Sequence, residues 1–560
     1  MNYQKLKEIL NSKFSKKEIE DLLGEKIYNA ILEWSNSEDS YIKTSLVDLL
    51  ISINGYGLFN NKAFRNRFFK SVPLAILQGL LECQESNHAA LAERAAKTEF
   101  GNNPFYKKLF TDFFECPDYN FIDDVAEPMG EIIQGSQNKF YELFDYQYLI
   151  KQQAIYELNK PSTLGRKMLI HMPTGTGKTK TTMHILANYL NFINKNGFVL
   201  WVAHTKELLG QALETFANIW GHLGLRDITV EKSWGVGTHQ MHSGVYFTTI
   251  QSLQSLKKSD IDTYEKLCQQ TTLMVYDECH KIGAKKTNEI VNDFSKSTEK
   301  SKKYFIGLTA TPGRTTVDSL ENRIFNEVFD GKIEIDIKLV DRISMGKNQA
   351  INNTTTTDVI GYFQDRKILS KLIKEQIEYE VPDEIVEEIK KEIISKKEEF
   401  SDSLLQKIAD NKARNTKILE RLIKLNEQGK PTIVFACSLD HAKMLSAFLN
   451  IEKIPNSLVY GDMLPATRKQ AIADFKNRDN NTNIIINYDI LTTGFDSTNI
   501  ECVFITRPTK SVILYSQMIG RGLRGPQMGG GESCLLIDVK DNLDAYNENE
   551  AFSHFNNYWR

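Results

Sequence analysis

Apolar residues repeat along this chain with two different periods, and the change of period divides it into blocks. In residues 1–135, segments such as KKEIEDLLGEKIYNAILEW and LVDLLISI space their apolar residues three and four apart, which predicts amphipathic helices. From about residue 140, short β-branched runs alternate with helical segments: KMLIHMP, FVLWVAHT, GVYFTTIQ, TLMVYDE and YFIGLTATP. This alternation predicts parallel strands joined by helical crossovers.

The alternation stops near residue 345 and resumes near residue 415. The stretch between holds a polar run, NQAINNTTTTD, and a charged amphipathic run, DEIVEEIKKEIISKKEEF, which predict a linker and helices. The strands that follow are PTIVFACS, NSLVYGD, NIIINYD, ECVFITRP and CLLIDV. We therefore expect an α/β protein with a helical N-terminal domain (1–135), a first parallel-sheet domain (136–345), a helical linker or insertion (346–414) and a second parallel-sheet domain (415–560).

Composition narrows the class of protein. A chain of 560 residues is too long for one hydrophobic core, and 41% hydrophobic with 25% charged residues is ordinary for a globular protein. The net charge of −3 gives no global basic field, although a local basic groove would be enough to bind nucleic acid. No apolar run has the length of a membrane span, and the start lacks a signal-peptide core. Seven scattered cysteines without a CxxC pair favour a cytoplasmic protein over a zinc or disulfide framework.

The N-terminal block carries no chemical motif. Its aromatic-rich segment NPFYKKLFTDFFECPDYNF could stack on bases, but core and loop is the favoured interpretation. The block could bind a protein partner, regulate the rest of the chain or contact DNA, and the sequence does not choose among these roles.

A glycine-rich loop, HMPTGTGKTKTT (171–182), lies between a predicted strand and a predicted helix. Gly175 and Gly177 would let backbone amides cradle phosphate at the helix N-terminus. Lys178 would then reach the β- and γ-phosphates, and the Thr179 hydroxyl would bind Mg²⁺. The general pattern has a glycine where Met172 stands, but the strand, loop and helix context favours a nucleotide site over a bare turn.

A second candidate group follows the predicted strand TLMVYDE. Asp277 would hold Mg²⁺ through its water shell, and Glu278 would orient and deprotonate the attacking water. The alternative is an acidic strand end that caps the next helix. Cys279 and His280 could be imagined as a nucleophilic pair, but neighbours on an extended strand point in opposite directions. A coupling role for His280 is favoured.

Near the C-terminus, SQMIGRGLRG (516–525) combines two arginines with three glycines. Each glycine inside a helix costs about 1 kcal/mol relative to alanine, so an ordinary helix surface is an unsatisfying explanation. Arg521 and Arg524 could be solvated charges or could meet an anion. Beside the phosphate loop, the second interpretation is favoured.

Together these segments resemble the superfamily 2 helicases and translocases of the DExH branch over residues 140–545. LFDYQYLIKQQAI resembles the adenine-reading Q motif, with Phe144 where the family has arginine. The remaining segments resemble motifs Ia (VLWVAHTKELLGQ), Ib (FTTIQSL), III (GLTATP), IV (IVFACSLDHA), V (ILTTGFDSTNI) and VI (QMIGRGLR). The resemblance implies two tandem RecA-like domains that enclose ATP and Mg²⁺ in a cleft.

The resemblance also implies a role for each matching residue. Catalysis would use Glu278, Gln517, Arg521 and Arg524, and Mg²⁺ would be held by Thr179 and Asp277. Coupling would use His280, Thr309 and Thr311. The nucleotide would be bound by Phe144, Gln147, Thr174, Gly175, Thr176, Gly177, Lys178, Thr179, Gly494 and Asp496. Nucleic acid would be bound by His204, Thr248, Thr249, Gln251, Ser438 and Thr493.

Within the superfamily, the segment from motif V to CLLIDVKDN is most similar to type I and type III restriction motor subunits and bacterial repair translocases. That similarity favours double-stranded DNA as the partner, and repair, restriction or phage defence as the setting. An RNA helicase or RNA-stimulated ATPase, and an ATP-gated nucleic-acid clamp that does not unwind, stay open as alternatives. An inactive relative is disfavoured, because motifs I, II and VI keep their chemical groups.

Overall fold

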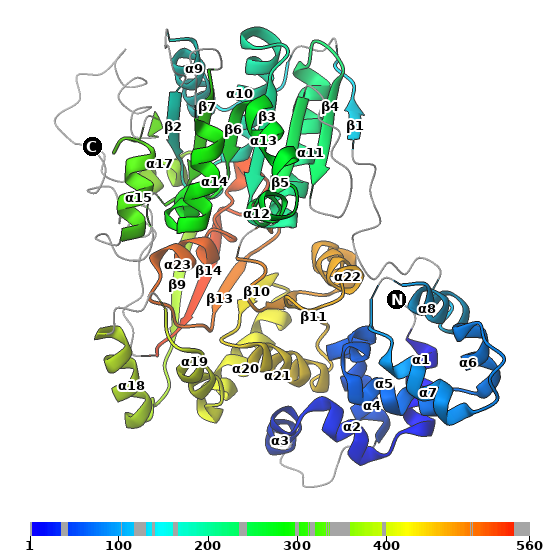
Figure 1. Cartoon of the computed structure of the whole chain (residues 1–560). Coiled ribbons are helices and arrows are strands. Elements are labelled where there is room, and N and C mark those ends of the chain that lie inside the picture. The colour runs from blue at the N-terminus through cyan, green and yellow to red at the C-terminus, as the bar shows by residue number, and fades with distance from the viewer. Residues whose placement is uncertain are drawn as a thin grey trace.

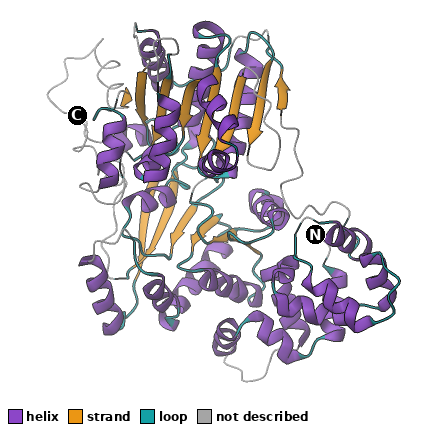
Figure 2. Cartoon of the chain, viewed as in Figure 1, coloured by secondary structure: helices purple, strands orange, loops and turns teal. Residues whose placement is uncertain are grey.

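The structure, a computed structural model, describes residues 3–34, 43–101, 103–116, 130–136, 140–160, 166–233, 244–296, 302–311, 313, 320–331, 333, 335–336, 359–394, 399–492, 494–495 and 497–541. Figure 1 shows two sheet-containing lobes, one above the other, and a helical domain beside the lower lobe. Figure 2 shows that the strands are confined to the two lobes and that the N-terminal domain is drawn as helices and loops.

The N-terminal domain is built from short helices: α1 (Gln4–Lys13), α2 (Lys16–Leu23), α3 (Glu25–Trp34), α4 (Lys43–Asn54), α5 (Lys62–Ser71), α6 (Leu74–Leu81), α7 (His88–Lys97) and α8 (Pro104–Lys108). Its centre is aromatic, with the Phe59 ring in edge contact with Phe64, Phe68 and Phe110. Tyr106 and Phe110 of the aromatic-rich segment are fully buried. The prediction that this segment is core is confirmed for its described part.

The upper lobe, called the first lobe, holds a sheet of eight described strands in the order β1-β4-β5-β3-β6-β7-β2-β8. The strands are β1 (Gly130–Ile133), β2 (Arg166–His171), β3 (Phe198–Ala203), β4 (Ile228–Ser233), β5 (Gly244–Thr249), β6 (Thr271–Tyr276), β7 (Tyr304–Thr309) and β8 (Ile335–Asp336). β1 pairs antiparallel with β4, and the other pairings are parallel. All six residues of β3 are buried. Parallel strands that are covered on both faces appear in a sequence as continuous apolar runs. These strands could therefore be predicted from the sequence.

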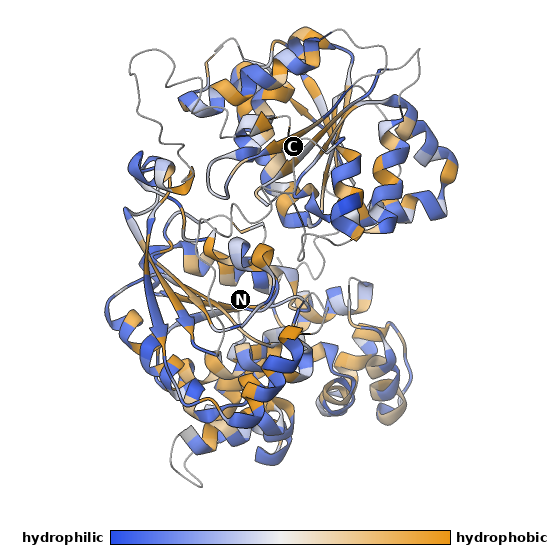
Figure 3. Cartoon of the chain, turned by 90° about the vertical axis from the view of Figure 1, so that its left-hand side faces the viewer, coloured by the Kyte–Doolittle hydropathy of each residue, from blue (hydrophilic) through white to orange (hydrophobic). Residues whose placement is uncertain are grey.

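Helices surround the first sheet: α9 (Asp145–Asn159), α10 (Lys178–Asn188), α11 (Lys206–Leu223), α12 (Ile250–Ser259), α13 (Ile261–Gln270), α14 (Lys285–Ser295), α15 (Leu320–Val328) and α17 (Val359–Asp365). Figure 3 shows the hydrophobic residues gathered on the strands and on the helix faces turned toward them, with hydrophilic residues outside. No helix among the described residues is long and apolar enough to cross a membrane.

The second lobe holds a six-stranded sheet of parallel pairs in the order β11-β12-β10-β13-β14-β9. Its strands are β9 (Lys371–Ile377), β10 (Thr432–Phe435), β11 (Asn456–Val459), β12 (Ile484–Asn487), β13 (Cys502–Ile505) and β14 (Ser533–Val539). Its helices are α18 (Asp383–Ile394), α19 (Asp402–Ala409), α20 (Lys412–Glu427), α21 (Leu439–Ile451), α22 (Pro465–Lys476) and α23 (Val512–Ile519).

Two segments predicted as helix or linker are strands, and the prediction is wrong there. β1 lies inside the block 1–135, and β9 lies inside the block 346–414. Both are edge strands, and most of their residues are exposed or half-exposed, so KLIKEQI carries charges where a central strand would be apolar. That charge density made β9 look like part of a solvated helix.

The N-terminal domain docks on the second lobe. α3 and α4 contact α21, and the buried residues of the two bodies form one continuous hydrophobic cluster. Asn450 of α21 donates to the Ser52 hydroxyl at 3.1 Å, and Lys412 pairs with Glu33 at 3.3 Å. The domain is therefore attached to the second lobe through a shared core as well as through surface contacts.

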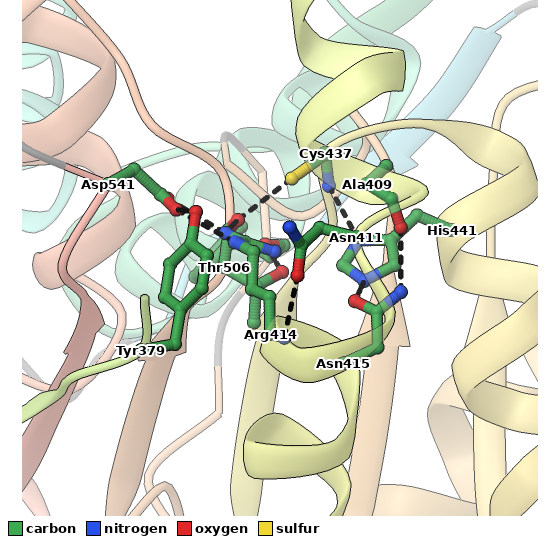
Figure 4. A network of polar contacts seen from close by, with 10 residues as sticks. Tyr379, Ala409, Asn411, Arg414, Asn415, Cys437, His441, Thr506 and Asp541 are labelled. Carbon is green, nitrogen blue, oxygen red and sulfur yellow. Dashed lines mark hydrogen bonds and ion pairs between the residues drawn. The ribbon is translucent and has the colours of Figure 1, made fainter. Parts of the chain in front are cut away.

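A buried polar network fastens α20 to the sheet of the second lobe (Figure 4). The Arg414 guanidinium is fully buried and donates to both oxygens of Asp541, each at 2.8 Å. It also donates to the Thr506 carbonyl, and the Tyr379 hydroxyl donates to Asp541 at 2.7 Å. The ends of β9, β13 and β14 are thereby joined at one ion pair.

Candidate nucleotide site between the two lobes

The phosphate loop has the backbone that the sequence predicts. It runs from the end of β2 to Lys178, the first residue of α10. Gly175 and Gly177 have φ angles of +85° and +81°, values that residues with a Cβ atom rarely adopt. A Cβ on Gly177 would lie 2.4 Å from the Gln147 amide nitrogen, so a side chain there would displace that amide. The loop is shaped to turn amides toward an anion at the start of α10.

The first turn of α9 is hydrogen-bonded to the phosphate loop. The buried Gln147 amide donates to the Thr176 carbonyl at 3.0 Å, and its oxygen accepts from the Phe144 amide at 3.1 Å. The Tyr146 hydroxyl donates to the same Thr176 carbonyl at 2.8 Å. Tyr146 was not singled out from the sequence. The signal that could have found it in the sequence is its position directly before Gln147, the glutamine of the Q motif.

Lys178 is connected to the segment Thr309–Thr311 through Met172. The Lys178 ammonium donates to the Met172 carbonyl at 3.3 Å, and the Met172 amide donates to the Thr309 carbonyl at 3.1 Å. The Thr309 hydroxyl in turn donates to the Thr311 carbonyl at 2.6 Å. Met172, which stands where the general pattern has glycine, is fully buried in the core of the first lobe.

Two adjacent carboxyl groups follow β6 and differ in acidity. Burial and the neighbouring Glu278 charge raise the pKa of Asp277, against the opposing effect of Lys178. Burial would also raise the pKa of Glu278, but the His280 ring at 3.4 Å and the Lys178 ammonium lower it below its usual value. Glu278 also has a left-handed backbone, with φ of +53°, which is uncommon for a side-chain-bearing residue at a strand end.

These residues fit a magnesium site in their chemistry. The Thr179 hydroxyl follows Lys178 directly, and Asp277 is a buried carboxylate whose charged form burial disfavours. A divalent cation is the partner that offsets such a cost, and oxygen ligands are the ones Mg²⁺ prefers.

Cys279 and His280 lie in a 3-10 helix (Cys279–Gly283) and not on the extended strand end that the sequence analysis assumed. Cys279 is fully buried, and a Cβ on Gly307 would lie 2.8 Å from its sulfur, so the thiol faces the sheet. Burial, with the adjacent carboxylates, raises the pKa of this thiol well above its usual value. Cys279 is therefore no nucleophile in this arrangement.

The stretch 516–525 of the second lobe lies directly on the phosphate loop. A Cβ on Gly520 would lie 2.5 Å from the Thr174 methyl group, and a Cβ on Gly175 would lie 3.8 Å from the Leu523 carbonyl oxygen. The two lobes therefore meet at the predicted nucleotide site, between segments about 340 residues apart in sequence.

The predicted catalytic residues of this stretch have different surroundings. Gln517 has a buried amide nitrogen that lacks a hydrogen-bond partner among the described residues. Arg521 donates to the Phe495 carbonyl at 2.5 Å and to the Gln517 carbonyl at 3.3 Å. Arg524 lines a polar groove against α11. The Gln517 amide nitrogen is thus a buried donor without a partner among the described residues, while Arg521 contacts its own lobe.

Most of the residues predicted to bind nucleic acid are already buried or hydrogen-bonded within their own lobe. Thr248 and Thr249 are 1% and 7% exposed, and Thr249 caps α12 by accepting from the Ser252 amide at 3.0 Å. The Ser438 hydroxyl caps α21, and His204 contacts the Tyr276 hydroxyl at 2.8 Å. Side-chain contacts to nucleic acid from Thr248 and Thr249 are not supported by this geometry. Gln251 is exposed at the first turn of α12.

Motif V is described only in part, since Thr493 and Asp496 lie outside the described residues. Gly494 has φ of +69°, and a Cβ there would lie 3.3 Å from the Leu208 amide of α11. Its carbonyl accepts from the Gln211 amide. This contact joins motif V of the second lobe to motif Ia of the first, and sequence reasoning missed it because the partners are distant in the chain.

Two family models match the chain. Residues 140–314 match the type III restriction enzyme res subunit, and residues 414–525 match the helicase conserved C-terminal domain. The two matched segments lie in the two lobes that meet at the phosphate loop.

Curated relatives agree with these matches. The Irc3 protein of Schizosaccharomyces pombe, whose name describes a mitochondrial ATP-dependent helicase, is 26% identical over 68% of this chain and 54% of its own length. Irc3 of Saccharomyces cerevisiae is 27% identical over 71% of this chain and 51% of its own. The chain thus spans about half the length of these relatives.

A solved structure of a fragment of an HsdR subunit of a type I restriction enzyme from Vibrio vulnificus YJ016 matches 74% of this chain and 66% of its own length, with 20% identity and a TM-score of 0.46.

Over its two sheet-containing lobes the chain is therefore similar to the superfamily 2 helicases. Within that superfamily it resembles the type III restriction subunit group.

Proposed function

We propose that this protein is an ATP-dependent helicase or translocase that acts on DNA. The observation that carries the proposal is the contact of Gly520 and Leu523 with the phosphate loop at Thr174 and Gly175. A nucleotide bound to the loop would touch both lobes there, so its hydrolysis would depend on their closure and its release would permit opening.

The residues of the first lobe would divide the chemistry of hydrolysis. Lys178 and the loop amides would bind the phosphates, and Thr179 with Asp277 would hold Mg²⁺. When bound, Mg²⁺ would neutralise charge that develops on the phosphates. Glu278, whose pKa is lowered, is ionised near neutral pH and would orient and accept a proton from the attacking water.

The second lobe would complete the site. The buried Gln517 amide nitrogen offers a hydrogen bond to the attacking water or the terminal phosphate. Arg521 and Arg524 would act as arginine fingers, a device worth about 10³- to 10⁵-fold in rate in nucleotide hydrolases. Arg521 would exchange its contact with the Phe495 carbonyl for phosphate as the lobes close.

DNA is the favoured partner. The Mph1 protein of Aspergillus fumigatus, named an ATP-dependent DNA helicase, is 29% identical over 34% of this chain and 16% of its own length. The type III restriction match also supports a duplex DNA substrate. We place the protein in DNA repair, restriction or phage defence, in a reducing compartment such as the cytoplasm, where its seven free cysteines would stay unpaired.

The working units are proposed to be the N-terminal helical domain, the first lobe with β1, and the second lobe with β9 and α18 to α20, so that no separate insertion lies between the lobes. Because the N-terminal domain shares a core with the second lobe, it would move with that lobe. A protein partner bound to it would thereby reach the motor through α21.

The first test replaces Lys178. Lys178→Ala removes the ammonium next to the phosphate loop, and we expect nucleic-acid-stimulated ATPase to fall at least 100-fold. Lys180→Ala on the same helix is the matched control, because the Lys180 ammonium lies over the Tyr141 ring, 4.9 Å from its centre. Near-normal turnover in Lys178→Ala would contradict the site.

A second test identifies the substrate. ATPase stimulation is compared for duplex DNA, single-stranded DNA and RNA at one salt concentration, because phosphate contacts make all three salt-sensitive. Strongest stimulation by DNA is expected. Strongest stimulation by RNA would indicate an RNA helicase. ATPase without strand displacement or translocation would indicate an ATP-gated clamp.

A further inference from the structure

The helix pair α18–α19 contacts the loop that begins motif VI. The pair lies at the lower left of Figure 1, and residues 399–400 lead into α19. The loop, residues 506–511, joins β13 to α23, the helix that carries Gln517 and ends two residues before Arg521. Resting on the proposed function, we propose that Glu399 is a positioning residue for ATP hydrolysis, which fixes this loop and thereby the end of α23 that faces the nucleotide.

The Glu399 carboxylate binds two consecutive residues of this loop. One oxygen accepts from the Lys510 backbone amide at 2.9 Å, and the other accepts from the Thr509 hydroxyl. Hydrogen bonds to a carboxylate are roughly twice as strong as those between neutral groups. Because both oxygens belong to one rigid group, the two bonds set the orientation of the loop as well as its distance from the helix pair.

Lys510 provides a second attachment. Its ammonium donates to the Glu392 carbonyl of α18 at 2.8 Å and lies 5.5 Å from the centre of the Phe400 ring. Phe400 is buried in the small hydrophobic cluster of the helix pair, which also includes Cys437, a residue that follows β10. The helix pair is thereby anchored to the second lobe and gives the loop a fixed support.

The same loop caps α23. The Thr509 hydroxyl accepts from the Ser511 amide at 3.0 Å, and the Ser511 hydroxyl accepts from the Leu514 amide at 3.2 Å. An N-cap bond of this kind stabilises the first turn of a helix. Glu399 is therefore joined to the first turn of α23 by a chain of hydrogen bonds through Thr509 and Ser511.

The rest of α23 is held at two further points. The Tyr515 hydroxyl donates to Asp538 of β14 at 3.0 Å, and Gly520 lies against Thr174 of the phosphate loop. A helix of eight residues is hydrogen-bonded throughout, so a shift of its first turn would also shift its last. The predicted catalytic residues near that end would then be misplaced, and a displacement of about 1 Å can cost roughly 100-fold in rate.

The test removes the two acceptors in the full chain by Glu399→Ala. We expect kcat of nucleic-acid-stimulated ATPase to fall about 10-fold while KM for ATP changes less than about twofold, because residues of the first lobe bind the ground-state nucleotide. Glu399→Gln should recover most of kcat, since its amide can accept from the Lys510 amide and donate to the Thr509 hydroxyl.

Glu388→Ala is the matched control. It removes the ion pair with Lys407 that joins α18 to α19, and it leaves the Glu399 carboxylate in place. We expect its kcat to stay within about twofold of the unmodified protein. Thr509→Val is a second variant, which removes the hydroxyl between Glu399 and Ser511 but keeps the shape of the side chain, and it should lower kcat as Glu399→Ala does.

Steady-state ATPase and the thermal unfolding midpoint are measured for all four variants. This inference alone is overturned if Glu399→Ala or Thr509→Val has the kcat of the control, if the loss appears in KM, or if Glu399→Gln is as slow as Glu399→Ala. An unmodified protein without nucleic-acid-stimulated ATPase overturns the proposed function and this inference with it.

Discussion

Glycines in the stretch 516–525 are explained by space. Gly520 has an ordinary helical backbone, with φ of −57°, so conformational freedom does not require glycine there. A Cβ would instead lie 2.5 Å from the Thr174 methyl group of the other lobe. Gly522 is similarly confined, because a Cβ would lie 2.4 Å from the Cys534 sulfur within its own lobe. The weak helix formers permit close packing at the nucleotide site.

Gly520→Ala should therefore impair closure of the lobes. We expect ATPase to fall about 10-fold or more while the thermal unfolding midpoint changes little, because the clash is between lobes and they can separate slightly. Gly221→Ala in α11 is the control, since a Cβ there meets nothing within 4 Å. It should keep full activity and gain stability of up to about 1 kcal/mol. Full activity in Gly520→Ala would show that the contact is dispensable.

At the scale of elements, central strands and edge strands differ in how well the sequence predicts them. β3 and β5 are buried at every position and read directly as apolar runs. β1 and β9 lie at sheet edges, carry charges and were predicted as helix or linker. Edge strands need fewer apolar residues because one side faces water, so local sequence lacks the information that places them.

β9 also depends on an element far along the chain. It pairs with β14, and its end is joined to α20 through Tyr379, Asp541 and Arg414. The carboxylate and the guanidinium are 1% and 0% exposed, so each would be an uncompensated buried charge without the other.

Arg414→Ala should destabilise the second lobe by about 3–5 kcal/mol, because Asp541 would be left buried and unpaired. The measurement is urea unfolding followed by far-UV circular dichroism. Lys390→Ala is the control, because its pair with Glu387 has side chains 63% and 61% exposed, and it should change stability by less than about 1 kcal/mol. Equal effects in the two variants would mean that the buried pair is not structurally important.

At the scale of the whole molecule, the N-terminal domain belongs to the second lobe in space but is followed in sequence by the first. α3 and α4 contact α21 of the second lobe, and the chain then reaches β1 at the edge of the first sheet. The N-terminal domain and the β1 segment are therefore linked covalently across the two lobes, which would limit how far the lobes separate.

Removal of residues 1–116 should expose the apolar face of α21. We expect the unfolding midpoint to fall by roughly 2–4 °C for each kcal/mol of packing lost, and the truncated chain to bind more of a hydrophobic dye. Calorimetry and dye binding measure this. An unchanged midpoint with unchanged dye binding would show that the domain is only loosely attached.

The sequence by itself determined the local chemistry of this protein. The glycines and Lys178 of the phosphate loop, the acidic pair Asp277 and Glu278, and the buried strands all follow from neighbours in the chain, because a phosphate loop and a buried strand are local structures. Only the tertiary structure decided that Gly520 lies on Thr174, that β9 completes the second sheet, that the N-terminal helices dock on α21 and that Arg524 lines the groove with α11. Those contacts join residues hundreds of positions apart, and the packing of the whole chain fixes them.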